Sequence, residues 1–140
     1  MNKIDSFQGE YRFLSNFVGG IFDTNGDFWP SVEHAFQAMK TRDLGQREMI
    51  RNATTPGLAK RLGRTVTLRP DWGDVRVSVM EKLVRRKFCQ NKELGKKLLA
   101  TADAELVEGN TWNDKFWGVC KGTGQNHLGK ILMKIREELR

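Results

Sequence analysis

The spacing of apolar residues along the chain predicts that most of it is helical. Between Ser31 and about Arg42 they recur at positions i, i+3, i+4 and i+7, which places them on one face of a helix. Ser31 stands just before this run, where a serine hydroxyl accepts a hydrogen bond from a backbone N–H group of the first turn. The apolar stripe of this helix consists of Val32, Ala35, Phe36 and Met39.

The same kind of pattern predicts five further helices. Thr55 and Pro56 are a typical cap and first-turn residue for one of them, and Gly63 is a typical end. The longest helix is expected to bury Val75, Val79, Leu83 and Phe88, and its basic end, Arg85 to Lys87, is expected in solvent. These helices are predicted at about residues 46–52, 55–63, 70–88, 91–101 and 126–139, with Asn91 and Asn126 as caps of the last two.

Extended structure is predicted only in short pieces. Ile21-Phe22 and Phe28-Trp29 flank a segment of turn-forming residues, which predicts a β-hairpin. A brief strand is expected at residues 106–108. No repeat or linker divides the 140 residues, and a chain of this length typically builds one core. We therefore expect a mainly α fold, with a small β element near the N-terminus, in a single compact domain spanning residues 1–140.

A second, polar stripe runs beside the apolar stripe of the first predicted helix. Glu33, Gln37 and Lys40 also follow the spacing i, i+4, i+7, one position along from Val32. A carboxylate, an amide and an amine at the edge of a core are suitable for one side of a catalytic site. Patterned charges of this kind are also typical of an ordinary solvated helix face, so the spacing alone leaves both interpretations open.

The charge balance favours an anionic partner. Lysine and arginine outnumber aspartate and glutamate by 24 to 17, a net charge of +7. Such an excess suits phosphate groups or nucleic acid, although many small basic proteins bind neither. The chain has no apolar run of the roughly 20 residues that cross a bilayer, and its start has no signal-peptide pattern. We therefore expect a cytoplasmic location and no contact with membranes.

The cysteines and histidines predict neither a disulfide framework nor a metal site. Cys89 and Cys120 form no CxxC arrangement, so they are expected to be reduced thiols. His34 and His127 are the only histidines, and with these cysteines they match no spacing of a zinc site. No metal and no cofactor is expected.

Three irregular segments combine aromatic with polar side chains, as a pocket for a planar ligand does. They are the loop of Ser15, Asn16 and Phe17, the Trp72/Arg76 turn, and the loop from Trp112 to Gly118. Flat rings stack on flat ligands, at about 1–3 kcal/mol per base. A glycine-rich turn before the last helix, Gly124-Gln125-Asn126, is a candidate for a phosphate, because backbone N–H groups at a helix start bind anions.

The ordered set of these motifs resembles the YbiA/NADAR family over nearly the whole chain. The matching segments are residues 13–17, 29–40, 71–72 with the helix to residue 88, 106–108, 113–114, 116–118 and 124–129. The resemblance implies a YbiA-like domain with N-glycosidase activity. One group of the family acts on ribosylamino-pyrimidine phosphate intermediates of riboflavin biosynthesis. Another removes ADP-ribose from ADP-ribosylated guanine in DNA or RNA, reversing a toxin's modification.

Both substrate classes join C1′ of ribose to an exocyclic amine, and this bond suggests the chemistry. Such a glycosylamine can open to an imine, from which a deprotonated lysine displaces the amine. Lys40 is the candidate for this role. Direct hydrolysis with two carboxyl groups is the alternative. Glu33 is expected to act as a base or a charge stabiliser, because the helix dipole favours its anion near the start of the helix. Asp114 matches the other acidic position of the family and is expected to contact the sugar or the leaving amine.

The resemblance also implies roles for the residues that would bind the substrate. Trp72, Trp112 and Trp117 are expected to sandwich the base, although the position of Trp112 is often polar in the family. Arg12, Arg76 and the turn at residues 124–126 are expected at phosphates, and Asn16 at the ribose or base. The other candidate binding residues are Ser15, Phe17, His34, Gln37, Asn113, Gly118, Gln125 and Asn126.

The sequence favours a nucleotide-sugar adduct as substrate, with ADP-ribosylated guanine in nucleic acid preferred because of the net charge. A riboflavin intermediate is the alternative substrate. A different class of protein, a non-catalytic module that binds ADP-ribose or nucleic acid, is also compatible with the binding residues. None of Glu33, Lys40 and Asp114 is replaced, however, which favours an enzyme.

Overall fold

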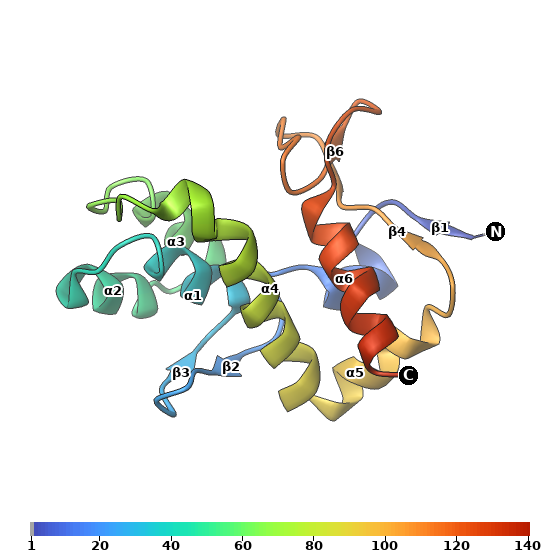
Figure 1. Cartoon of the computed structure of the whole chain (residues 1–140), viewed down its shortest axis with the longest axis horizontal. Coiled ribbons are helices and arrows are strands. Elements are labelled where there is room, and N and C mark those ends of the chain that lie inside the picture. The colour runs from blue at the N-terminus through green and yellow to red at the C-terminus, as the bar shows by residue number, and fades with distance from the viewer. Residues whose placement is uncertain (1) are drawn as a thin grey trace. The chain divides into compact units, whose positions relative to one another are not determined.

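The structure is a computed structural model that describes residues 2–140. Its residues form two compact units, one of residues 16–90 and the other of residues 2–15 together with 91–140. Helices are the main elements of both units (Figure 1), which confirms the mainly α fold. None of the helices between residues 2 and 140 is long and apolar enough to cross a membrane.

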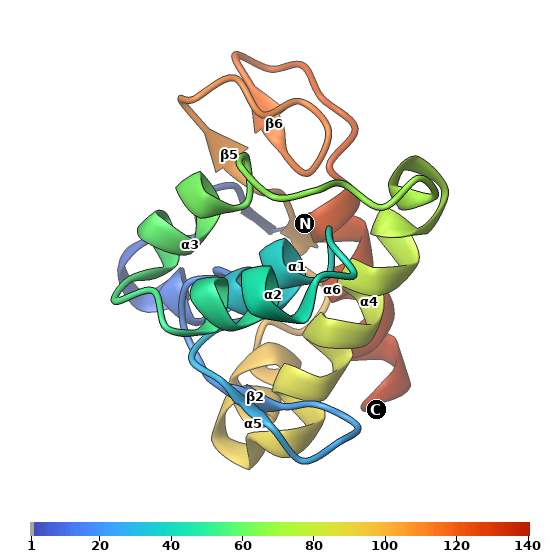
Figure 2. The same cartoon turned by 90° about the vertical axis from the view of Figure 1, so that its left-hand side faces the viewer.

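The unit of residues 16–90 is built around helix α1 (Val32–Ala38). This helix contacts α2, α3 and α4 (Figure 2), and all seven of its residues are buried. The polar stripe is therefore enclosed along with the apolar one. The other elements of the unit are β2 (Ile21–Phe22), β3 (Phe28–Trp29), α2 (Leu44–Arg51), α3 (Pro56–Leu62) and α4 (Trp72–Gln90).

Helix α1 begins where the sequence predicts and ends earlier. Ser31 is its N-cap, and Ser31 Oγ accepts a hydrogen bond from the backbone N–H of His34 at 3.1 Å. The helix ends at Ala38 rather than near Arg42, and Lys40 lies in the following turn. The backbone carbonyl of Lys40 accepts a hydrogen bond from Arg69 N at 2.7 Å. The end of α1 is thus fixed by a hydrogen bond to a segment distant in the sequence. The spacing of residues along α1 cannot predict such a contact.

The predicted caps and hairpin of this unit are confirmed. Thr55 caps α3, with its hydroxyl accepting the backbone N–H of Leu58 at 3.0 Å, and Pro56 stands in the first turn. Strands β2 and β3 pair antiparallel with Ile21 opposite Trp29. The carboxylate of Asp23 organises the turn between them by accepting backbone N–H bonds from Asn25 and Asp27.

The buried face of α4 differs from the prediction. Leu83 and Phe88 are buried as expected, but Val75 and Val79 are only half-buried. Lys87, predicted in solvent, is 0% exposed, and burial lowers its pKa to about 7. Packing of α4 against α1 and β2 selects this face, whereas helical periodicity along α4 alone does not identify it.

The unit of residues 2–15 and 91–140 combines helices with two parallel strand pairs. Strand β1 pairs with β4, and β5 pairs with β6. The sequence predicts short strands and loops before residue 30 and a strand near residue 106, but not the parallel pairing, because parallel strands are not joined by a hairpin turn that marks them in the sequence. The elements are β1 (Lys3–Ile4), the 3-10 helix η1 (Gly9–Leu14), α5 (Lys92–Ala100), β4 (Glu105–Leu106), β5 (Gly109–Asn110), β6 (Val119–Cys120) and α6 (His127–Glu138).

Helix α6 has the predicted apolar face but not the predicted cap. Leu128, Ile131, Leu132 and Ile135 are buried. Asn126 stands at the N-cap position in the left-handed conformation, with φ of 54°, and its side chain makes no capping bond. Asn91 likewise makes no side-chain capping bond at the start of α5. The amide of Asn126 is used elsewhere, in contacts described below.

Candidate functional site

Glu33 and Gln37 form a buried pair on α1. Gln37 Nε2 donates a hydrogen bond to Glu33 Oε2 at 2.6 Å. Glu33 is 8% exposed and Gln37 5% exposed. The other amide atom, Gln37 Oε1, is buried and accepts no hydrogen bond from the described residues. The pair therefore offers one carboxyl group and one unsatisfied acceptor, both shielded from water by the surrounding helices.

Burial changes the expected charge behaviour of Glu33. Removal from water raises the pKa of its carboxyl group above the ordinary value, and this effect exceeds the opposing effects of the Gln37 hydrogen bond and of nearby positive charges. The prediction from the helix dipole favoured the anion, and desolvation outweighs it. A carboxyl group with a raised pKa keeps its proton to higher pH than an ordinary carboxyl group, which suits a group that donates and takes up protons in catalysis.

Lys40 is the amine next to this carboxyl group, in the turn after α1. It is half-buried, and burial lowers the pKa of its ammonium group. The negative charge of Glu33 acts in the opposite direction, while Arg64 and Lys60 lower the pKa of Lys40 further. A lysine with a lowered pKa has more of the neutral amine, which is the nucleophilic form.

Two basic residues near this pair were not identified from the sequence. Lys60 lies on α3 and Arg64 just after it. Both disfavour the charged form of Lys40, and Lys60 also lowers the pKa of Glu33. No motif distinguishes them from other surface cations of the chain. Their role becomes visible only because α3 packs against α1.

His34 is held by the fold on both sides of its ring. Its Nδ1 lies 2.7 Å from Ser31 Oγ, and its Nε2 lies 3.0 Å from the carbonyl oxygen of Ala53. A carbonyl only accepts, so Nε2 carries the proton and Nδ1 accepts from the Ser31 hydroxyl. With both nitrogens engaged and the residue 1% exposed, His34 is suited to fixing the start of α1 rather than to contacting a ligand.

The other candidates of this unit lie before α1 and at the start of α4. The backbone carbonyl of Asn16 accepts the N–H of Glu33 at 3.1 Å, and Asn16 Nδ2 contacts Met80 Sδ at 3.4 Å. Phe17 is exposed. Trp72 is buried, with its ring 5.0 Å from that of Phe36, so it packs partly as core.

Asp114 organises the loop that joins β5 to β6. Its Oδ1 accepts backbone N–H bonds from Phe116 at 3.2 Å and from Trp117 at 2.9 Å. The amide side chain of Asn110 bonds both the backbone N–H and the carbonyl of Asp114. Asp114 therefore stabilises this loop. A role toward a substrate would be additional to this structural one.

The aromatic residues of this loop differ in exposure. Trp112 is 54% exposed, while Trp117 is half-buried and packs edge-on against Phe116 at 4.8 Å. Asn113 takes the left-handed conformation, with φ of 65°. Gly118 is buried, and a Cβ atom there would overlap the carbonyl oxygen of Glu108, so this loop closes only with a glycine at that position.

The predicted phosphate turn is partly committed to the fold. Asn126 Oδ1 accepts the backbone N–H of Glu108 at 3.0 Å, and Asn126 Nδ2 donates to the carbonyl of Leu106 at 2.9 Å. Gln125 is exposed, and its Oε1 lies 2.9 Å from His127 Nε2. The Asn126 side chain thus ties the turn to Leu106 of β4 and to Glu108. The backbone N–H groups of residues 125–128 donate to carbonyl oxygens of residues 115–118, so they are not available to a phosphate, contrary to the prediction.

Arg12, Ser15 and Arg76 complete the predicted set. Arg12 is exposed on η1, and Ser15 caps the end of that helix with its backbone N–H bonded to Arg12 O at 2.9 Å. Arg76 is half-buried on α4. The structure therefore brings together Glu33, Gln37 and Lys40 in one unit, and the residues around Asp114 in the other. Between residues 2 and 140, no three His, Cys, Asp or Glu side chains gather as metal ligands.

Comparison with known proteins identifies a family for the chain. A family model described as the NADAR domain matches residues 5–140, which takes in parts of both units. The chain is 44% identical over 137 residues to the N-glycosidase YbiA of Escherichia coli, covering 96% of this chain and 85% of that protein. An N-glycosidase of Nostoc punctiforme is 40% identical over 136 residues, covering 93% of this chain and 86% of the relative.

A riboflavin biosynthesis protein of Vibrio vulnificus is 45% identical over 132 residues, covering 92% of this chain but 36% of that longer protein. Among solved structures, the NMR structure of Escherichia coli YbiA matches with a TM-score of 0.86 and 42% identity. The match covers 99% of this chain and 86% of that one.

Proposed function

We propose, since the chain belongs to the NADAR family and is a hydrolase of N-glycosyl bonds, that it removes ADP-ribose from ADP-ribosylated guanine in DNA or RNA. The bond broken joins C1′ of ribose to an exocyclic amine of the base. The observation that carries this proposal is the buried Glu33 with the half-buried Lys40, in which the carboxyl pKa is raised and the amine pKa lowered.

Lys40 acts as the nucleophile in this mechanism. The ribose ring opens when the C1′–O4′ bond breaks, O4′ takes a proton, and C1′ becomes an imine of the exocyclic amine. The neutral amine of Lys40 adds to C1′, and the guanine amine leaves with a proton, so that the sugar is joined to Lys40 as an imine. Water then adds to C1′ and releases Lys40, and the free sugar closes its ring.

Glu33 moves the protons of these steps. Its raised pKa suits a group that protonates the departing amine and later takes a proton from water, as a general acid and base does. Direct hydrolysis, in which one carboxyl group assists departure of the amine and another directs water, is the competing mechanism, and Glu33 and Asp114 are each a candidate carboxyl group for it.

The remaining candidates are proposed to bind the substrate rather than to react with it. Trp112, Trp117 and Phe17 have exposed or half-exposed rings suited to stack on a base. Trp72 has most of its surface in the core, so only one edge of its ring would contact the base. Arg12 and Arg76 are proposed at phosphates.

A second substrate has its own support. Relatives of this chain are named riboflavin biosynthesis proteins, and a ribosylamino-pyrimidine phosphate has the same kind of bond to an exocyclic amine. The net charge of +7 favours the polyanionic substrate over this small one, because a basic protein attracts nucleic acid at long range.

Separate incubations with ADP-ribosylated DNA and with the ribosylamino-pyrimidine phosphate test the choice of substrate. We expect release of ADP-ribose from the DNA and slower or no conversion of the small intermediate. Conversion of the small intermediate alone would assign the second function. The Glu33→Gln protein serves as the inactive control in both reactions.

Borohydride trapping tests the mechanism. Reduction during turnover should leave the sugar covalently attached to Lys40, as peptide mapping by mass spectrometry would show. A Lys40→Ala variant should yield no adduct and no product. An active Lys40→Ala enzyme without any adduct would establish direct hydrolysis instead.

A further inference from the structure

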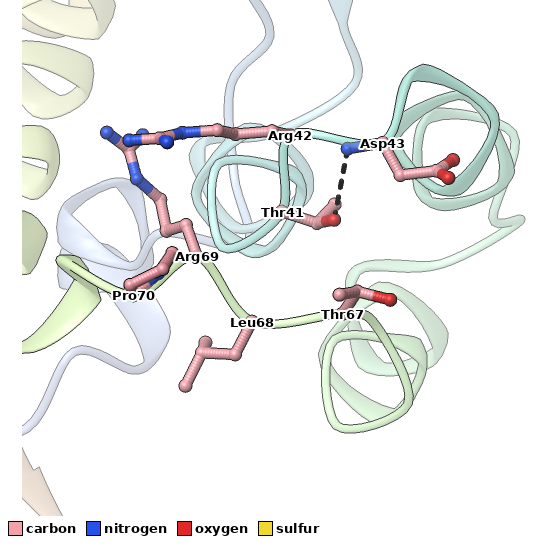
Figure 3. A pocket seen from close by; sticks show the side chains of 7 residues that line it. All are labelled: Thr41, Arg42, Asp43, Thr67, Leu68, Arg69 and Pro70. Atoms are coloured by element: carbon pink, nitrogen blue, oxygen red, sulfur yellow. Dashed lines mark hydrogen bonds between the residues drawn. The ribbon is translucent and has the colours of Figure 1, made fainter.

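A pocket of about 180 Å³ lies beside the end of α1, and the function proposed above does not use it. It is lined by residues that directly follow Lys40 and by residues of the segment between α3 and α4 (Figure 3). The two segments are joined by the hydrogen bond from Arg69 N to the carbonyl of Lys40, at 2.7 Å. The pocket therefore begins one residue beyond the proposed nucleophile.

Positive charge is concentrated at one side of this pocket. Figure 3 shows the guanidinium groups of Arg42 and Arg69 next to each other. Both turn toward the same carboxylate, that of Asp71. Arg69 pairs with it through two bonds of 2.6 and 3.0 Å, whereas Arg42 reaches it at only 3.5 Å. One carboxylate thus neutralises only one of the two cations.

A third cation adds to this field. Arg47 donates from Nε to the carbonyl of Thr41, a residue that lines the pocket, at 2.7 Å. Burial lowers the pKa of Arg47, and the charges of Arg69 and Arg42 lower it further. An anion bound among these three cations would reduce their mutual repulsion.

The second carboxylate at the pocket does not cancel the excess. Asp43 is the N-cap of α2, and its Oδ1 accepts the backbone N–H of Gln46 at 2.8 Å. Figure 3 shows its carboxylate pointing away from the guanidinium pair. The lining also includes Leu68, an apolar side chain that is 57% exposed.

We infer that this pocket binds a phosphate group of the substrate, with Arg42 and Arg69 as donors and Leu68 against the adjoining nucleoside. The inference rests on the proposed function, and it adds a specificity site to it. Guanidinium groups have planar sets of N–H donors that match phosphate oxygens. The exposed apolar side chain of Leu68 in the same pocket suits a phosphate esterified to a nucleoside better than free inorganic phosphate. The phosphate is either the diphosphate of ADP-ribose or a phosphodiester that flanks the modified guanine.

Arg42→Glu is the informative substitution. The side chain of Arg42 is 65% exposed and its one ion pair between residues 2 and 140 is long, so the fold does not depend on it. Arg69 anchors the loop through Asp71 and is unsuitable. Lys82→Glu, an equal charge reversal at an exposed position of α4, is the matched control.

Steady-state kinetics on two substrates test the inference and separate the sources of the phosphate. We expect Arg42→Glu to raise KM about ten-fold or more, as loss of a charged hydrogen bond does, with kcat little changed and Lys82→Glu close to wild type. A higher KM for ADP-ribosylated oligonucleotide alone assigns the flanking phosphodiester. A higher KM for ADP-ribosylated guanosine as well assigns the diphosphate. Unchanged KM for both overturns the inference.

Equilibrium binding distinguishes failure of this inference from failure of the proposed function. ADP-ribose and a single-stranded oligonucleotide are the probes, titrated into wild-type, Arg42→Glu and Lys82→Glu proteins. Weaker binding of either probe to Arg42→Glu, with binding to Lys82→Glu unchanged, supports the phosphate site. If the wild-type protein converts no ADP-ribosylated substrate, that failure overturns the proposed function but not the phosphate site. Equal binding of both probes by all three proteins would overturn the inference that the pocket binds phosphate.

Discussion

The side-chain amide of Gln37 lies directly against Gly63, so that a Cβ atom at residue 63 would overlap Gln37 Oε1. The backbone of Gly63 is in the ordinary right-handed region, so the glycine is needed for space and not for conformation. This contact fixes the amide whose Nε2 bonds Glu33 at 2.6 Å. A residue at the end of α3 thereby controls the hydrogen bonding of the proposed acid.

Gly63→Ala should displace the Gln37 amide and weaken its hydrogen bond to Glu33. The amide is the flexible end of its side chain, so we expect the fold to persist with a loss of about 1–3 kcal/mol in the free energy of unfolding. Because that bond lowers the pKa of Glu33, the limb of the pH–rate profile that reports Glu33 should move to higher pH. Urea denaturation and kcat measured against pH check both effects.

Gly57→Ala is the matched control for this substitution. A Cβ atom there meets only Thr55 Oγ1, at 3.9 Å, and alanine is the better helix former by about 1 kcal/mol. Gly57→Ala should therefore keep full activity at equal or greater stability. Equal pH profiles for the two variants would contradict the role of the Gln37 contact.

Glu33→Gln should abolish most activity while stabilising the protein at neutral pH. Loss of a general acid–base group lowers kcat by roughly 100-fold or more. The pKa of Glu33 is raised in the folded state, so the cost of burying its charge is absent below the unfolded pKa and grows as pH rises through the folded pKa. Glutamine has no such cost.

Thermal denaturation of both proteins between pH 4 and pH 8 measures this difference. We expect Tm of Glu33→Gln minus Tm of wild type to increase with pH and then level off. A difference that stays constant over the range would show that Glu33 does not titrate with a raised pKa.

Arg64→Gln should shift the pH dependence that reports Lys40. Arg64 is one of the charges that lower the pKa of Lys40, so its removal raises that pKa and reduces the neutral amine at a given pH. The ascending limb of kcat/KM against pH should move to higher pH. Arg61→Gln, at an exposed position one turn earlier, is the control, and an equal shift in that variant would point to general charge rather than to Arg64.

Two substitutions of Asp114 separate its structural task from its proposed catalytic one. Asp114→Asn keeps an oxygen that can accept the N–H groups of Phe116 and Trp117 but removes the charge. It should retain most stability and lose activity at least ten-fold. Asp114→Ala removes both and should also destabilise the loop by about 1–3 kcal/mol. An active Asp114→Asn enzyme would restrict Asp114 to the structural task.

Lys87→Met should remove a pH dependence of stability. The pKa of Lys87 is lowered to about 7 in the folded protein, so the unfolded chain binds an extra proton between that pH and the ordinary lysine pKa. Wild-type stability therefore rises with pH across this window. The stability of Lys87→Met relative to wild type should be greatest at pH 7 and below, and fall by a few kcal/mol toward pH 10. A stability difference between Lys87→Met and wild type that does not change with pH would contradict the lowered pKa of Lys87.

The sequence by itself determined the features that depend on neighbouring residues. The cap of α1 at Ser31, the cap of α3 at Thr55 and the hairpin of β2 and β3 follow from local hydrogen bonding and turn chemistry. The buried face of α6 follows from helical periodicity. The ordered motifs also indicated the family, and with it the class of bond that is hydrolysed, an N-glycosyl bond.

Only the tertiary structure decided how the polar residues of α1 behave. The spacing of Glu33, Gln37 and Lys40 is the same for a solvated face and for one side of a catalytic site. Contacts of α1 with α2, α3 and α4 enclose that face. Burial then raises the pKa of Glu33 and lowers that of Lys40. Desolvation and the charges of Lys60 and Arg64 depend on segments that meet only in the folded chain, so no local pattern in the sequence records them.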